Sequence, residues 1–152
     1  MATMAVDRMF LDTNILVYAT ISAAPLHAVA LRAVVDREQA GVELWVSRQV
    51  LREYLAVLTR PQTFTPPIPI MTLVAQITHF MHRFQVAGED TTTTAHLLTL
   101  LQTLPTGGKQ VHDANIVATM QANSIDQLLT HNVTNFSRFA GLITIVPLIP
   151  PP

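Results

Sequence analysis

The sequence contains no cysteine and few charged side chains, and each shortage excludes a class of protein. A chain without cysteine has no disulfide framework, no thiolate nucleophile and no cysteine-based zinc site. Charged residues make up 12% of the chain and the formal net charge is −1, which argues against a domain that coats nucleic acid through bulk electrostatics. Any contact with a polyanion must therefore be local.

Long apolar runs are also missing, although 49% of the residues are hydrophobic. No uninterrupted run approaches the roughly 18 apolar residues that a membrane-spanning helix needs. The start of the chain, MATMAVDRMFLD, has an apolar segment too short for a signal peptide, and Asp7 and Arg8 interrupt it. We therefore expect a cytoplasmic protein with no membrane segment and a large apolar core.

A length of 152 residues suits a single domain, with a core at about 8–146, a short N-terminal extension and the proline-rich tail PLIPPP. Short apolar segments predict strands at 8–11, 43–46, 85–87, 128–130 and 142–146. Helical spacing of apolar residues, with Pro25 in a first turn and Ser47 as an N-cap, predicts helices at 15–20, 25–40, 48–59, 70–84, 91–104 and 111–122. This alternation indicates a three-layer α/β/α sandwich with a mostly parallel central sheet of about five strands.

Four polar residues stand where parallel α/β sheets bind ligands, beyond the carboxyl ends of the strands. Asp12 follows the first predicted strand, and Glu53 lies about two turns into the helix after the second. Asp113 opens a late helix, and Asn132 follows the strand that ends at Thr130. The three acids lie in the apolar segments FLDTNILVY, VLREYLAVL and VHDANIVA, whereas most other acids occupy polar stretches.

Three carboxylates brought together would require a counter-charge. Two like charges about 4 Å apart repel by around 4 kcal/mol at an effective dielectric near 20, so the group needs a cation or a shifted proton. Carboxylate and amide oxygens are hard ligands, which favours Mg²⁺ or Mn²⁺ over Zn²⁺ or copper. Such a cation lowers the pKa of a bound water, orients it on a phosphodiester and neutralises charge on the leaving oxygen. The pattern therefore indicates metal-assisted hydrolysis without a covalent intermediate.

Each acid also has a simpler interpretation when it is taken alone. Asp12 and Asp113 stand at positions where an aspartate commonly caps a helix. Glu53 could instead form a salt bridge to one of three nearby arginines, Arg48, Arg52 and Arg60. The joint pattern is what favours a site.

Four segments in this order, FLDTNILVYA, SRQVLREYLAVL, VHDANIVATM and LLTHNVTNF, resemble the PIN-domain family, particularly the VapC-like toxins of bacterial toxin–antitoxin pairs. The resemblance runs from about residue 8 to residue 146. It implies a three-layer α/β fold, Mg²⁺- or Mn²⁺-dependent endoribonuclease activity on an RNA substrate, a homodimer, and inhibition by a small antitoxin that inserts into the site. It places the catalytic, metal-binding carboxylates on Asp12, Glu53 and Asp113.

The fourth motif departs from the family pattern, which usually has Asp or Asn after the Thr and often another Asp before the Phe. Here these positions are Asn132 and Asn135. An amide carbonyl still ligates Mg²⁺ but attracts a second cation poorly, so we expect one tightly bound metal. We expect Asn132 to assist catalysis, and Asn14, Thr130 and Asn135 to support the metal ligands.

Two rival interpretations stay open. The chain could be a catalytically degenerate PIN module that binds RNA or a protein partner without cleavage, which the two asparagines favour. It could also be a phosphotransfer or phosphatase-like domain with Asp12 as nucleophile, although such sites generally need a second Asp close in sequence or a Lys opposite, and the DTN segment supplies neither. In the nuclease interpretation, the basic side chains beside the motifs either contact the RNA backbone or are solvated surface, namely Arg48, Arg52, Lys109 and Arg138.

Overall fold

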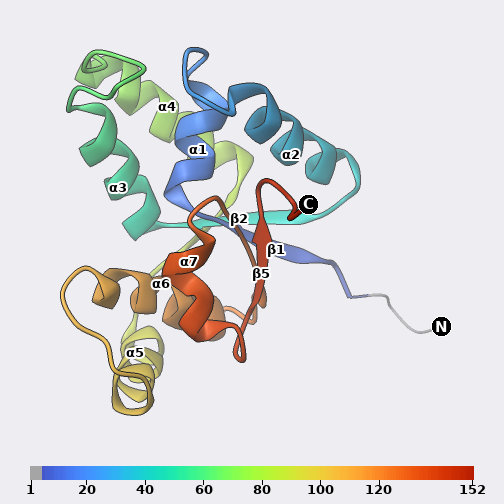
Figure 1. Ribbon diagram of the computed structural model, residues 1–152, viewed down its shortest axis with the longest axis vertical. Helices are drawn as coiled ribbons and strands as arrows, with labels where there is room; N and C mark the ends of the chain where they lie inside the picture. Colours follow the sequence, from blue (N-terminus) through green and yellow to red (C-terminus); the bar gives the residue numbers. More distant parts are fainter. Residues whose placement is uncertain (1–4) are drawn as a thin grey trace.

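A computed structural model describes residues 5–152, and its strands form one parallel sheet with helices on both faces (Figure 1). Residues 1–4 of the predicted N-terminal extension lie outside the described residues. The strand order is β3-β2-β1-β4-β5, and every neighbouring pair is parallel. The strands are β1 (Arg8–Leu11), β2 (Glu43–Ser47), β3 (Gln85–Ala87), β4 (Gln127–Thr130) and β5 (Thr144–Pro147). The predicted three-layer α/β/α class is thus confirmed.

The helices divide between the two faces according to the direction in which the chain crosses the sheet (Figure 1). The crossovers from β1 through β2 to β3 carry α1 (Thr13–Thr20), α2 (His27–Gln39), α3 (Arg48–Leu58) and α4 (Ile70–Arg83). The return to β4 and β5 carries α5 (Thr91–Thr103), α6 (Gln110–Ala122), α7 (Val133–Phe136) and the short 3-10 helix η1 (Ser137–Phe139). Over residues 5–152, none of these helices has the length and apolar content to cross a membrane.

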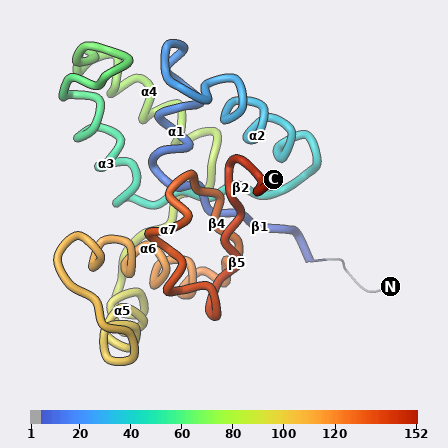
Figure 2. Tube along the Cα trace, in the orientation of Figure 1, coloured from blue at the N-terminus to red at the C-terminus, as the bar shows by residue number. Residues whose placement is uncertain are grey.

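Strands from distant parts of the chain lie side by side at the centre of the sheet, where β1 pairs with β4 (Figure 2). The helix after β1 covers one face and the helix after β4 covers the other, so a crevice opens between the two strand ends. Both strands are buried on each side, and Phe10 and Leu128 are completely inaccessible to solvent. This rigid centre fixes the positions of the residues that follow β1 and β4.

Side-chain caps determine where the helices around this crevice begin. Asp12 accepts a hydrogen bond from the backbone N–H of Thr13 at 2.8 Å, so α1 starts directly after β1. Ser47 accepts from the N–H of Val50 at 3.2 Å, which confirms its predicted role as the cap of α3. Each of these helices therefore leaves the sheet without an intervening loop.

The second helix begins later than predicted. Leu26 adopts a left-handed backbone conformation with φ of 63°, and α2 starts at His27. Pro25 lies in the preceding turn, because a left-handed residue interrupts the right-handed path of a helix. The expectation that Pro25 occupies the first helical turn is therefore wrong.

The end of the sheet also differs from the predicted boundary. Strand β5 ends at Pro147, and Leu148 is buried with its backbone N–H donating to the carbonyl of Thr130 at 3.0 Å. The first residues of the segment interpreted as a tail thus belong to the packed structure. Their apolar side chains cover the edge of the core beside β4.

Candidate active site

An open pocket of about 360 Å³ lies beyond the ends of β1 and β4, at the crevice between the two faces of the sheet. Its lining includes all three candidate acids, Asp12, Glu53 and Asp113, together with Asn132 and Asn135. A second hollow of about 640 Å³ adjoins it and shares Glu53, Asp113 and Asn135. The fold thus gathers the candidate residues of four separate sequence motifs around one space.

Asp12 is buried, and both of its oxygens accept hydrogen bonds. Oδ1 accepts from the N–H of Thr13, while Oδ2 accepts from Asn14 Nδ2 at 2.9 Å and from the Thr130 hydroxyl at 2.8 Å. Burial raises the pKa of Asp12 above its usual value of 3.8 and the charge of Glu53 adds to the rise, whereas the three donors oppose it. Asp12 does cap α1, but a cap uses only one oxygen, so the capping role alone does not account for its surroundings.

Asn14 and Thr130 tie the ends of β1 and β4 together around that carboxylate. The side-chain oxygen of Asn14 accepts from the backbone N–H of His131 at 2.9 Å. The hydroxyl oxygen of Thr130 accepts from the N–H of Asn132 at 3.0 Å while its proton is donated to Asp12. Both side chains therefore contact the candidate ligand and fix its orientation.

Glu53 lies on α3, and its carboxylate is held by two donors from two helices. Oε2 accepts from the Thr13 hydroxyl of α1 at 2.7 Å, and Oε1 accepts from Gln49 Nε2 of α3 at 2.8 Å. Within residues 5–152 no ion pair includes Glu53, and the neighbouring Arg52 lies 3.8 Å from Glu89 instead. The simple salt-bridge interpretation of Glu53 is therefore wrong.

Asp113 lies in the first turn of α6 and is partly exposed to the pocket. Burial and, after it, the negative charges of Asp12 and Glu53 raise the pKa of Asp113 from 3.8 to about 6, against the effect of nearby basic groups. The N-cap position of this helix is Lys109, so capping does not explain Asp113. The mutual influence of the three carboxylates shows that they form one electrostatic unit.

The donor set suits a hard divalent cation, although the acids do not converge on a single point. Over the described residues, no three His, Asp or Glu side chains are arranged to hold one ion directly. The oxygens of Asp12 and Glu53 already accept hydrogen bonds, and the repulsion that raises the pKa of Asp113 is what a cation relieves. Oxygen ligands with part of the coordination left to water fit Mg²⁺ or Mn²⁺.

Basic side chains border the second hollow, but the set differs from the predicted one. Arg52 and Lys109 line it as expected, and Arg60 joins them from the segment that follows α3. Arg138 donates to the backbone carbonyl of Pro105 at 2.9 Å and to the side chain of Gln110, the first residue of α6, at 2.8 Å. Arg48 lies outside both linings. The local cationic surface is therefore made by Arg52, Arg60 and Lys109.

One residue that sequence reasoning missed is Gln49, which is only 5% exposed and donates to Glu53. Its signal in the sequence was weak but present. It is a polar side chain one helical turn before Glu53, on the same face of an otherwise amphipathic helix. Buried polar groups need hydrogen-bond partners, so a buried glutamine beside an acid indicates a specific hydrogen bond between the two.

The sheet order and the acidic pocket at its centre define the class of protein, a parallel α/β domain with a carboxylate site at the switch point. The sequence model of the PIN domain family matches residues 9–142. The chain therefore belongs to the PIN domain family. No curated protein matches the sequence significantly.

Solved structures with the same fold include chains of bacterial VapBC complexes and the toxin VapC20. A chain of VapBC2 from Rickettsia felis, bound to a DNA fragment from its promoter, is 21% identical, with a TM-score of 0.65 over 92% of this chain and 98% of that one. A chain of DNA-bound VapBC from Salmonella typhimurium is 20% identical, with a TM-score of 0.64 over 95% and 100%. VapC20 of Mycobacterium tuberculosis, described as a Sarcin-Ricin loop cleaving toxin, is 17% identical, with a TM-score of 0.59 over 79% and 86%. At these identities the likeness establishes the fold.

Proposed function

We propose that the protein is a Mg²⁺- or Mn²⁺-dependent endoribonuclease and the toxin of a toxin–antitoxin pair. The observation that carries the proposal is that Asp12, Glu53 and Asp113, from three separate segments of the chain, line one open pocket. Membership of the PIN domain family supports it. So does the likeness to chains of VapBC complexes and to a toxin that cleaves the Sarcin-Ricin loop.

The chain's own residues have distinct roles in this proposal. Asp12 and Asp113 hold the cation, because they are the two carboxylates whose ionised forms the surroundings penalise. Glu53, fixed on both oxygens, orients water at the edge of the pocket, and Asn132 offers its amide to the same water or to a phosphate oxygen. A bound divalent ion supplies an activated water and charge neutralisation at the phosphodiester.

The surfaces beside the pocket support the proposed substrate and partners. Arg52, Arg60 and Lys109 give a local set of cations for the RNA backbone, which reconciles nucleic-acid binding with a net charge of −1. A small antitoxin that enters the open pocket would block both hollows. On α4, Met71 is 73% exposed and Ile70 is 53% exposed, and such apolar area suits contact with an antitoxin or with a second copy in a homodimer.

Metal-dependent cleavage tests the proposal. Purified protein, separated from any antitoxin, should cut single-stranded RNA in millimolar Mg²⁺ or Mn²⁺ and lose this activity in excess chelator. Asp113→Asn keeps the side-chain shape and removes the charge, so it should abolish cleavage while circular dichroism and the unfolding midpoint show a folded protein. Equal cleavage by the wild type with and without chelator would rule the mechanism out.

The degenerate PIN module is a second candidate, and the fourth motif favours it. Asn132 and Asn135 line the pocket at positions where family members often carry carboxylates, which lowers the negative charge available to a cation. Titration calorimetry with Mn²⁺ separates the two candidates. Absence of binding at millimolar Mn²⁺ would favour a module that binds RNA or protein without cutting.

A further inference from the structure

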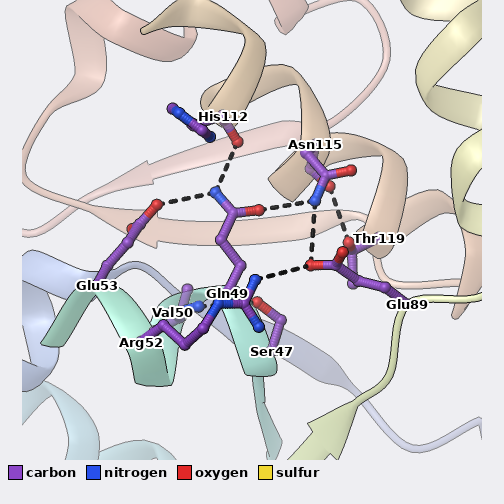
Figure 3. Close-up of polar contacts among 9 residues, drawn as sticks. All are labelled: Ser47, Gln49, Val50, Arg52, Glu53, Glu89, His112, Asn115 and Thr119. Carbon is purple, nitrogen blue, oxygen red and sulfur yellow. Dashed lines mark hydrogen bonds and ion pairs between the residues drawn. The ribbon is translucent and has the colours of Figure 1, made fainter. Parts of the chain in front are cut away.

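Gln49 connects the helix that carries Glu53 to the helix that carries Asp113 (Figure 3). Its Nε2 donates two hydrogen bonds, to Glu53 Oε1 at 2.8 Å and to the backbone carbonyl of His112 at 2.9 Å. Its Oε1 accepts from Asn115 Nδ2 at 2.8 Å. The side chain is thus saturated with contacts although it is only 5% exposed.

These partners allow one orientation of the Gln49 amide. The two groups at Nε2 are acceptors, and the group at Oε1 is a donor. If the Gln49 amide were flipped, its oxygen would face two acceptors, the Glu53 carboxylate and the His112 carbonyl. Its NH₂ group would face the NH₂ group of Asn115. The surroundings of Gln49 therefore direct one N–H at Glu53 and the other at the His112 carbonyl.

The far side of Gln49 is itself held in place. Asn115 donates to Glu89 Oε1 at 3.2 Å as well as to Gln49, and Glu89 lies 3.8 Å from Arg52 (Figure 3). A chain of polar contacts therefore leads from the exposed Arg52 to the buried Gln49. These contacts hold the Gln49 side chain in one rotamer even if the Glu53 side chain changes its own.

Glu53 in turn receives one donor on each oxygen, from Gln49 on its own helix and from Thr13 on α1. Two contacts from different directions fix both the rotamer and the plane of the carboxylate. Neither donor neutralises the negative charge of Glu53, because both are uncharged groups. The carboxylate is therefore held in position while its charge stays available to the pocket.

We propose that Gln49 is a positioning residue that sets the place of the Glu53 carboxylate relative to Asp113. This inference rests on the proposed nuclease function, in which Glu53 orients water at the edge of the metal site. Gln49 touches neither substrate nor cation in this role and acts through Glu53. Groups that orient the residues around a metal typically change metal affinity or activity by about 10- to 100-fold when removed.

The test compares two variants of the same helix. Gln49→Met keeps the length and bulk of the side chain and removes its donors. Ser47→Ala is the matched control, because it removes the N-cap of α3 without touching Glu53. Gln49→Met should lower kcat about 10- to 100-fold with little change in KM for RNA, whereas Ser47→Ala should leave both constants unchanged. Equal losses of kcat in the two variants would mean that Gln49 serves only stability.

A double-mutant cycle on Mn²⁺ binding tests whether Gln49 acts through Glu53. By titration calorimetry, Gln49→Met should weaken Mn²⁺ binding about tenfold or more in the wild type and have no further effect in the Glu53→Gln background. The same loss in both backgrounds would overturn the proposal, because it would show an effect independent of Glu53.

Crystal structures of the wild type and Gln49→Met separate this inference from the proposed function. The Glu53 carboxylate should leave its place in the variant while the backbone of α3 stays unchanged. If the carboxylate keeps its place, the positioning role is wrong whether or not the protein cuts RNA. If the carboxylate moves but the wild type neither binds Mn²⁺ nor cleaves, the positioning geometry holds and the nuclease function fails.

Discussion

The hydroxyl of Thr13 donates a 2.7 Å hydrogen bond to Glu53, and the backbone N–H of the same threonine donates at 2.8 Å to Asp12. One residue therefore holds two candidate site carboxylates, one through its side chain and one through its backbone. Burial is the main cause of the raised pKa of Asp12, and repulsion by Glu53 adds to it, so neutral donors of this kind help to hold the two acids in place.

Thr13→Val should lower activity more than it lowers stability. Valine keeps the shape and the backbone N–H but removes the hydroxyl, so Glu53 loses a donor while Asp12 keeps its cap. We expect a loss of about 1 kcal/mol in the free energy of unfolding and about a tenfold fall in kcat. Thr99→Val is the control, because the exposed Thr99 hydroxyl donates to the Ala95 carbonyl of its own helix, outside the linings of both hollows. A full kcat for Thr13→Val would contradict the role given to Glu53.

Stability should depend on pH through Asp113. Its proton is bound more tightly in the folded chain, with a pKa of about 6, than in the unfolded chain near 3.8. The stabilising contribution of this group is therefore complete below about pH 3.8 and is lost as pH rises through 6. In chelator at pH 7.5, Asp113→Asn should be more stable than the wild type. Its free energy of unfolding should be about 1–2 kcal/mol larger, after allowance for solvent screening.

Denaturant unfolding at several pH values measures this difference, which should shrink as pH falls toward 4.5. Saturating Mn²⁺ should reverse the order of stability, because the cation stabilises the ionised cluster of the wild type by roughly 2.7 kcal/mol at a hundred times its Kd. Identical unfolding curves for the two proteins at pH 7.5 in chelator would show that the pKa of Asp113 is not raised.

Restoring carboxylates in the fourth motif should strengthen metal binding. Asn135→Asp adds a negative charge to the lining of both hollows and should raise Mn²⁺ affinity about tenfold. The metal-free variant should also unfold more easily, since a fourth acid adds repulsion. Gln39→Glu adds the same charge at an exposed position on α2 and serves as the control for net charge. Calorimetry with equal affinities for the two variants would argue against a cation in this pocket.

Arg60 is expected to contribute to RNA binding and not to chemistry. It lines both hollows, so Arg60→Gln should weaken RNA binding and raise KM while kcat stays within about twofold. One lost phosphate contact should reduce the slope of log affinity against log salt by roughly 0.7 for single-stranded RNA. Arg32→Gln, an exposed change on α2, should leave the slope unchanged. Fluorescence anisotropy at three or more salt concentrations supplies the measurement.

The sequence by itself determined the order and class of the elements. Apolar segments of strand length alternate with apolar residues at helical spacing, and this local periodicity predicts a parallel α/β sandwich before any contact is known. It also placed Asp12 and Asn132 beyond strand ends, because the ends of parallel strands share one edge of the sheet. The start of α3 after Ser47 was likewise predictable, since a cap is a contact between neighbours in the chain.

Only the tertiary structure decided which groups meet across elements. Arg52 pairs with Glu89 of another segment, Glu53 is held by Thr13 of α1, and Gln49 reaches α6. The spacing of residues along a helix shows which side chains share a face, but it does not show what lies opposite that face. Burial and repulsion are set by the packed surroundings, so the raised pKa of Asp113 also depends on the fold, whereas its sequence neighbour His112 opposes the rise.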